Sequence, residues 1–279
     1  MPPALIVHGG AGRWSAALAA ATDAGCARAA DAGWAVLRAG GSALAAVLAA
    51  VEVLEDDPLF NAGIGACLAA GGQVELDASV MDGATGRGAG VAGLTTVRHP
   101  IRLAAALLDA SPVLLAGAGA EAFARRAGLA TGPPEAFVTA RQRRNWIART
   151  VERGTVGAVA VDRAGRVAAA TSTGGLTGKL AGRIGDSAVI GAGTYASAGG
   201  AASATGPGEA IILAGLARVA VDQLDGGADP ERVAAACVGR LAQRPGGGGA
   251  GLIVVDRFGR IGSATSAEAM PIARRSSHG

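Results

Sequence analysis

The chain has 279 residues, of which 50% are hydrophobic and 17% are charged, and this composition excludes a globally disordered protein. The formal net charge is +3, and only 3% of the residues are aromatic. Proteins that bind single-stranded nucleic acid interleave basic and aromatic residues, so the composition argues against nucleic acid as a partner.

The N-terminal part of the chain predicts a buried strand followed by two helices. Residues 4–8 form a short apolar run, and helical patterns follow over 15–39 and 42–55. Ser42 is a suitable N-cap for the second helix. That helix ends before Pro58, because the residue preceding a proline is disfavoured in the helical region.

The next part of the chain ends in a basic segment. Residues 73–81 alternate as a strand with one covered face does, and residues 101–110 and 121–127 have helical patterns. The segment of about 131–154 then opens with Gly-Pro-Pro and becomes polar and rich in arginine. It is compatible with a surface helix, with a flexible connector, or with both in succession.

Two segments of the C-terminal half share one pattern. Residues 156–173 and 252–264 each read as two apolar strands joined by a short turn, which predicts β-hairpins. Asp162 in the first segment corresponds to Asp256 in the second. The order of elements favours an antiparallel sheet covered by helices over a Rossmann sheet. The sequence has no dinucleotide-binding glycine motif after a strand, and no Walker A motif.

Other sequence features indicate a cytoplasmic protein. The three cysteines are widely spaced without a C-x-x-C pair, and the three histidines lack the spacing of metal ligands. The first ten residues have no basic and apolar signal sequence, and the alanine-rich segment 43–54 is too short to span a bilayer. We therefore expect neither a disulfide framework nor a membrane partner.

Three threonines lie beside glycines at the edges of predicted elements: Thr155, Thr173 and Thr205. Clustered hydroxyls beside glycine can form a polar pocket, but threonine is also common at strand ends, and Thr205 could cap a helix. A threonine hydroxyl is a weak nucleophile unless a base takes its proton, and a free α-amine can do this near neutral pH. Thr155 acquires such an amine only if the Gly154–Thr155 bond is cut.

The chain resembles the plant-type L-asparaginase / isoaspartyl aminopeptidase family over about residues 4–270. The resemblance rests on ordered motifs: HGGAG (8–12), NAGIGA (61–66), ELDASVMDG (75–83), GTVGAVAVD (154–162), TSTGG (171–175), GRIGDS (182–187) and TGPGE (205–209). It implies one α+β domain over 1–279, a four-layer αββα sandwich of the N-terminal-nucleophile hydrolases. It also implies self-cleavage into an α subunit, 1–154, and a β subunit, 155–279.

The resemblance assigns roles to particular residues. It makes Thr155 the nucleophile freed by cleavage after Gly154, with Thr173 orienting it. The other implied roles are the oxyanion donors Thr205 and Gly206, the self-processing residue Asn61, the carboxylate-binding Arg183, the ammonium-binding Asp186, and Gly206 and Gly208 lining the substrate. Without the family, Arg183 and Asp186 also read as a surface ion pair.

The same resemblance implies no cofactor for catalysis but a structural sodium ion, held by backbone carbonyls. The matching positions are Leu54, Glu55, Asp57, Phe60, Ala62 and Ile64. Oxygen ligands suit a hard cation, although the stretch alone reads as the end of a helix and its loop. The implied substrate is asparagine or a β-aspartyl dipeptide, which both carry a β-aspartyl unit, and the implied assembly is a dimer of αβ heterodimers.

Two other functions remain open at this point. One is a glycosylasparaginase-like amidase, although that branch usually carries aspartate where this chain has Gly154. The other is an uncleaved homologue that binds a ligand without catalysis, although the four residues whose loss would mark it are all present: Thr155, Thr173, Thr205 and Arg183. The chain departs from the family in a shorter connector and in Ala269, where glycine is expected.

Overall fold

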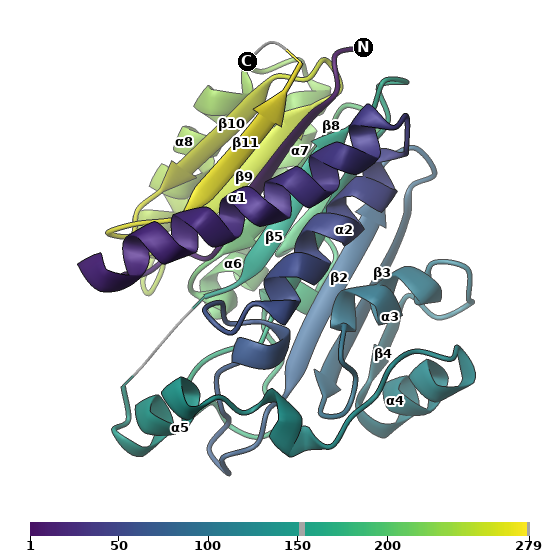
Figure 1. The fold of residues 1–279 in the computed structure, drawn as a ribbon. Coiled ribbons are helices and arrows are strands. Elements are labelled where there is room, and N and C mark those ends of the chain that lie inside the picture. The colour runs from purple at the N-terminus through teal and green to yellow at the C-terminus, as the bar shows by residue number, and fades with distance from the viewer. Residues whose placement is uncertain (151–153, 278–279) are drawn as a thin grey trace.

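The computed structural model describes residues 1–150 and 154–277 and contains two stacked β-sheets (Figure 1). In this part of the chain the larger sheet has, in spatial order, β11 (Ile272–Ser276), β1 (Ala4–His8), β5 (Val156–Val161), β6 (Val167–Thr173), β2 (Leu76–Asp82), β3 (Arg87–Leu94) and β4 (Leu114–Ala116). The smaller sheet has β10 (Ile261–Thr265), β9 (Gly251–Asp256), β8 (Gly200–Thr205) and β7 (Thr194–Ala196). All pairings are antiparallel except that of β3 with β4.

Helices cover the outer face of each sheet (Figure 1). The larger sheet is covered by α1 (Ala16–Arg38), α2 (Ala43–Asp56) and α3 (Pro100–Leu107), with α4 (Gly117–Arg126) beside β3 and β4. The smaller sheet is covered by α7 (Leu216–Asp225) and α8 (Pro230–Ala242), with α6 (Gly208–Ala214) leading into α7. The predicted α+β sandwich with helices outside both sheets is therefore confirmed.

Alternating side chains build the separate layers of the core. In β1, Leu5 and Val7 pack in the cluster beneath α1 and α2, whereas Ile6 packs between the two sheets with Val159 and Ile253. This alternation follows from the strand period of two residues, which sends successive side chains to opposite faces. β1 thus contributes to two layers, and it lies between β11 and β5, both of which come from the C-terminal part of the chain.

Several elements differ from the sequence predictions. Between the two predicted hairpins the sequence has helical patterns over about 208–224 and 230–243. The first of these is broken, because Gly215 adopts the left-handed conformation at φ 58° between α6 and α7. The sequence patterns also missed β3, β4, β7, β8 and β11, which are short or rich in alanine and glycine. Within residues 1–150 and 154–277, no helix is long and apolar enough to cross a membrane.

The connector contains helical structure where the sequence left alternatives open. It begins with a 3-10 turn, η2 (Pro134–Phe137), and continues with α5 (Ala140–Ile147), which Thr139 caps through its side chain. The remainder of the predicted connector includes residues 151–153, which lie outside the described residues.

Candidate active site

Two of the predicted threonines face each other at the edge of a hairpin. Thr155 immediately precedes β5, and the pairing of Val156 with Ser172 places it opposite Thr173 at the end of β6. The Thr155 hydroxyl donates a hydrogen bond to Oγ1 of Thr173 over 3.3 Å, and both residues are buried. The antiparallel register therefore brings together two side chains that are separated by a complete hairpin.

The carbonyl oxygen of Gly154 is held from two sides. It accepts hydrogen bonds from Nδ2 of Asn61 over 2.8 Å and from Oγ1 of Thr173 over 2.9 Å. The amide of Asn61 is itself fixed, because Nδ2 also donates to the carbonyl of Gly175 and Oδ1 accepts from the amide of Cys67. Two donors on one peptide carbonyl polarise it and stabilise negative charge on its oxygen.

The third threonine has a different environment. Thr205 ends β8, and its Oγ1 accepts a hydrogen bond of 3.1 Å from the backbone amide of Ala11, in the HGGAG loop. The following Gly206 has φ 134°, and a Cβ atom there would lie 2.7 Å from the Cα of Ala250, so only glycine fits. A small cavity beside the threonine pair is lined by Gly154, Thr155, Thr173, Gly175, Leu176, Arg183, Gly185, Asp186 and Gly206.

Two charged side chains from one loop enter this cavity. Arg183 donates from Nε to Oε1 of Glu209 over 2.8 Å. Asp186 is 4% exposed, its Oδ2 has no hydrogen-bond partner among the described residues, and burial raises its pKa to about 7. A Cβ atom at Gly208 would lie 2.7 Å from Nη2 of Arg183 and 2.9 Å from Oδ1 of Asp186, so glycine at this position leaves space for both groups.

The loop after α2 has two glycines that pack closely against backbone carbonyls. A Cβ atom at Gly63 would lie 2.2 Å from the carbonyl oxygen of Glu55, and one at Gly65 would lie 2.1 Å from that of Phe60. Glycine at these two positions in and around η1 (Gly63–Gly65) thus leaves room for two neighbouring carbonyls. Both carbonyls are among the six positions that the resemblance implies for sodium, and the ion itself stays a prediction.

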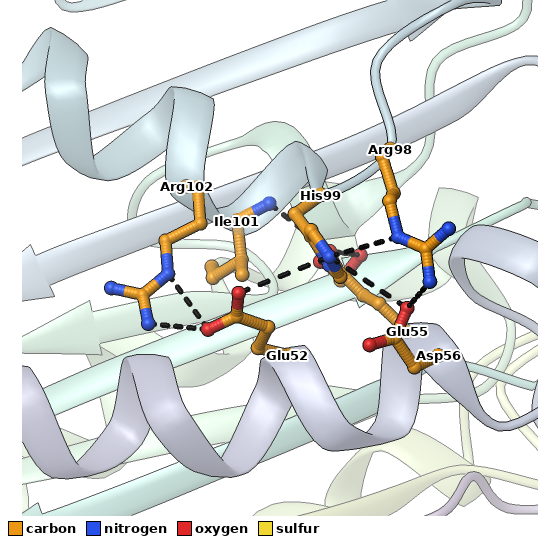
Figure 2. A network of polar contacts seen from close by, with 8 residues as sticks. Glu52, Glu55, Asp56, Arg98, His99, Ile101 and Arg102 are labelled. Carbon is orange, nitrogen blue, oxygen red and sulfur yellow. Dashed lines mark hydrogen bonds and ion pairs between the residues drawn. The ribbon is translucent and has the colours of Figure 1, made fainter. Parts of the chain in front are cut away.

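The Glu55 side chain lies next to His99 and Ile101 (Figure 2). Its Oε1 accepts from the backbone amide of Ile101 over 3.0 Å and from the hydroxyl of Ser172 over 2.6 Å, while Oε2 lies 3.5 Å from Nδ1 of His99. Burial raises the pKa of this carboxyl. No cluster of three or more acidic, histidine or cysteine side chains in the described ranges could hold a metal ion.

The connector helix is attached to the same loop. Arg141 donates to the carbonyls of Pro58 and Leu59, and Nε2 of Gln142 donates to the carbonyl of Gly65 over 2.8 Å. Gln142 is completely buried. None of these three acceptors is among the six carbonyls that the resemblance implies for sodium.

Four charged residues near the cavity were not singled out from the sequence: Glu75, Asp77, Lys179 and Glu209. Glu75 and Asp77 belong to the ELDASVMDG motif. They are two positions apart in a predicted strand, where side chains with this spacing project to the same face, and this signal could have identified them. Their partners lie about a hundred residues away, and no local pattern connects the two segments.

Comparison with known proteins gives one consistent result. A family model described as asparaginase matches residues 1–153 and 148–279, two matches that meet just before Thr155. An isoaspartyl peptidase/L-asparaginase of Xenopus laevis is 43% identical over 93% of this chain and 87% of its own length. The human protein of that name is 41% identical over 97% and 92%, and a plant-type L-asparaginase of Pyrobaculum calidifontis is 42% identical over 95% and 94%.

Proposed function

The chain belongs to the asparaginase family, and from that premise we propose that it hydrolyses the side-chain amide of L-asparagine and the isopeptide bond of β-aspartyl dipeptides. The observation that carries the proposal is the Gly154 carbonyl, held by Asn61 and Thr173 next to the Thr155 hydroxyl. Such an arrangement is suited to cutting the chain at this bond and freeing the Thr155 amine.

Self-cleavage is the first proposed step. The Thr155 oxygen attacks the Gly154 carbonyl carbon, while its proton passes through the Thr173 hydroxyl toward the carbonyl oxygen. The donor directions of the two hydrogen bonds, from Thr155 to Thr173 and from Thr173 to Gly154, support this path. The C–N bond then breaks, the nitrogen takes the proton, and water hydrolyses the resulting ester. The products are the chains 1–154 and 155–279.

Turnover then uses the new N-terminus. The substrate α-carboxylate pairs with Arg183 and its α-ammonium pairs with Asp186, which directs the β-carbonyl toward Thr155. The free amine takes the hydroxyl proton, and the oxygen forms an ester with the β-aspartyl group as ammonia or an amino acid leaves. The Thr205 hydroxyl and the Gly206 amide are the proposed oxyanion donors. Water finally releases aspartate and regenerates the threonine.

The remaining parts of the proposal concern assembly and ions. The two pieces form a dimer of αβ heterodimers in the cytoplasm, catalysis needs no cofactor, and a structural sodium ion occupies the loop carbonyls around η1. The family resemblance supports both the ion and the assembly. Dialysis against a sodium-free buffer should lower the melting temperature, and sodium should restore it.

The decisive experiment compares the purified protein with a Thr155→Ala variant after incubation at neutral pH. Intact mass and N-terminal sequencing should show a new chain beginning TVGAVAVD in the wild type alone, together with aspartate release from L-asparagine and from a β-aspartyl dipeptide. A wild-type chain that stays intact and releases no aspartate would refute the proposal and favour a non-catalytic binding protein. Turnover confined to a glycosylated asparagine would instead support the glycosylasparaginase-like alternative.

A further inference from the structure

One buried carboxylate connects the threonine pair to the loop that carries Arg183 and Asp186. Asp77 on β2 is paired in register with Thr173 on β6, and its side chain is completely buried. Directly opposed residues of an antiparallel pair project their side chains to the same face. The Oδ2 atom of Asp77 accepts a hydrogen bond of 3.3 Å from the backbone amide of Gly185, the residue before Asp186.

A second carboxylate holds the same loop on the other side of Arg183. Glu75 precedes Asp77 by two positions on the chain, and its two carboxylate oxygens lie 3.2 and 3.0 Å from the backbone nitrogen of Gly182. The two contacts thus bracket Arg183, one at the preceding residue and one two residues after it. Hydrogen bonds from a backbone amide to an ionised carboxylate are stronger than neutral hydrogen bonds, so they fix the loop backbone more firmly.

A buried lysine balances the charge of these carboxylates. Lys179 is 5% exposed, its Nζ donates to the carbonyl oxygen of Glu75 over 2.9 Å, and it lies 3.8 Å from Oε2 of the same residue. The positive charges of Lys179 and Arg183 oppose the effect of burial, which raises the pKa of the Asp77 carboxyl. The loop is therefore held by charged groups that belong to the fold and do not line the cavity.

We propose that Asp77, with Glu75, is a positioning residue that sets the distance between the Thr155–Thr173 pair and the substrate-binding loop of 182–186. This inference rests on the proposed function, because it assigns the binding of the substrate α-groups to Arg183 and Asp186. Displacement of a binding loop by about 1 Å can cost roughly a hundredfold in rate. Because Asp77 is paired in register with Thr173, β2 fixes the position of the loop relative to the threonine pair.

The two oxygens of Asp77 allow this role to be separated from a role in folding. Oδ1 accepts from the amide of Gly93 over 2.9 Å, a contact that joins β2 to β3, whereas Oδ2 alone reaches the loop. In Asp77→Asn the single amide oxygen satisfies the shorter Gly93 bond, and the amide nitrogen then faces the N–H of Gly185. Two donors cannot bond, so this substitution releases the loop and keeps the strand contact.

The test measures self-cleavage, kcat and KM for L-asparagine, and the inhibition constant of L-aspartate. In Asp77→Asn we expect KM and the inhibition constant to rise together by about tenfold or more, with the rate of self-cleavage within about twofold of the wild type. A role in folding alone would lower the melting temperature and the amount of active enzyme, and it would leave KM unchanged. Asp82→Asn, the same change on the same strand, is the matched control.

The outcomes separate this inference from the proposed function. An active wild type with an unchanged KM and inhibition constant in Asp77→Asn overturns the role of Asp77 alone. A wild type that neither cleaves itself nor releases aspartate overturns the proposed function and this role with it. If Asp77→Asn does not fold, Glu75→Ala removes the Gly182 contact instead, and a KM equal to that of the wild type in this variant also overturns the proposal.

Discussion

The two C-terminal hairpins, β5–β6 and β9–β10, have almost the same turn but belong to different sheets. In each turn an aspartate accepts from the backbone amides two and four residues later, and from the Nε atom of an arginine four residues later. The aspartates are Asp162 and Asp256, and both are buried. The similarity that the sequence predicts is thus reproduced bond by bond.

The strand ends of these hairpins are what differ. Both second strands end in threonine, Thr173 on β6 and Thr265 on β10. Each hydroxyl accepts from the backbone amide two residues later, that of Gly175 or Ala267. Thr173 donates to the Gly154 carbonyl, whereas Thr265 donates to the carbonyl of Ala250. One hairpin therefore serves the candidate site and the other serves the fold, although their local sequences are similar.

Removal of the hydroxyl at each strand end should separate the two hairpins most clearly. Thr173→Val removes a donor from the Gly154 carbonyl and the partner of Thr155, so self-cleavage should slow by about 10²–10³-fold. Thr265→Val should cost only about 1 kcal/mol of stability and leave cleavage unchanged. Time courses of intact mass measure the first effect, and denaturant unfolding measures the second. Equal cleavage rates in the two variants would exclude a special role for the first hairpin.

Ligand binding measured over a range of pH should distinguish Asp186 from the two turn aspartates, whose carboxylates accept several hydrogen bonds. Unlike the turn residues, Asp186 has an oxygen without a hydrogen-bond partner in the described structure, and burial raises its pKa to about 7. The substrate ammonium requires the ionised form of Asp186. The inhibition constant of L-aspartate should therefore decrease about tenfold for each unit that the pH rises toward 7, and it should level off above 7. A flat profile between pH 5 and 8 would contradict this assignment.

The raised pKa of Asp186 also affects the stability of the fold, which a rising pH should lower although it strengthens ligand binding. The pKa of Asp186 in the folded chain is above its ordinary value of 3.8, so its contribution to stability is fully present below that value. That contribution is lost as the pH rises through about 7. Asp186→Asn should therefore stabilise the protein near pH 8 and have little effect near pH 4. Denaturant unfolding of both proteins at the two pH values measures this difference.

The turns themselves should matter for stability and little for catalysis. Asp162→Ala and Asp256→Ala each leave two backbone amides and an arginine without their acceptor, at an expected cost of about 1–3 kcal/mol. The cost should be greater for Asp162, because its Oδ2 also accepts from the amide of Ala43 at the start of α2. Urea unfolding measures both values, and kcat should stay at the wild-type level. A greater loss for Asp256→Ala would mean that the Ala43 contact contributes nothing.

Local pattern accounts for the parts of the fold that were predicted from the sequence. Alternation, capping and turn residues are properties of neighbouring positions, so the hairpins, β1, and α2 with its Ser42 cap were found. The break at Gly215 was missed because one left-handed glycine interrupts an otherwise continuous helical pattern. The candidate site was predicted from the family resemblance. The spacing of the threonines alone was also compatible with ordinary strand ends and a helix cap.

What local pattern could not find is the set of contacts between distant segments. Asp77 and Gly185 are 108 positions apart, and their contact depends on how β2 pairs with β6 and where the loop after β6 returns. The hydrogen bond between Asn61 and Gly154 spans 93 positions. Such contacts depend on the whole sheet, so residues that hold the candidate site in place appear in the sequence only as ordinary polar residues in a strand.

The position of β1 between β11 and β5 has a consequence for the processed protein. β1 and β2 precede the predicted cleavage site and their partners β11, β5 and β6 follow it, so the two pieces would share one sheet across three strand boundaries. Unfolding of the cut protein then releases two molecules in place of one, and its refolding becomes second order. Its melting temperature should rise with protein concentration, whereas that of a monomeric, uncut chain should not.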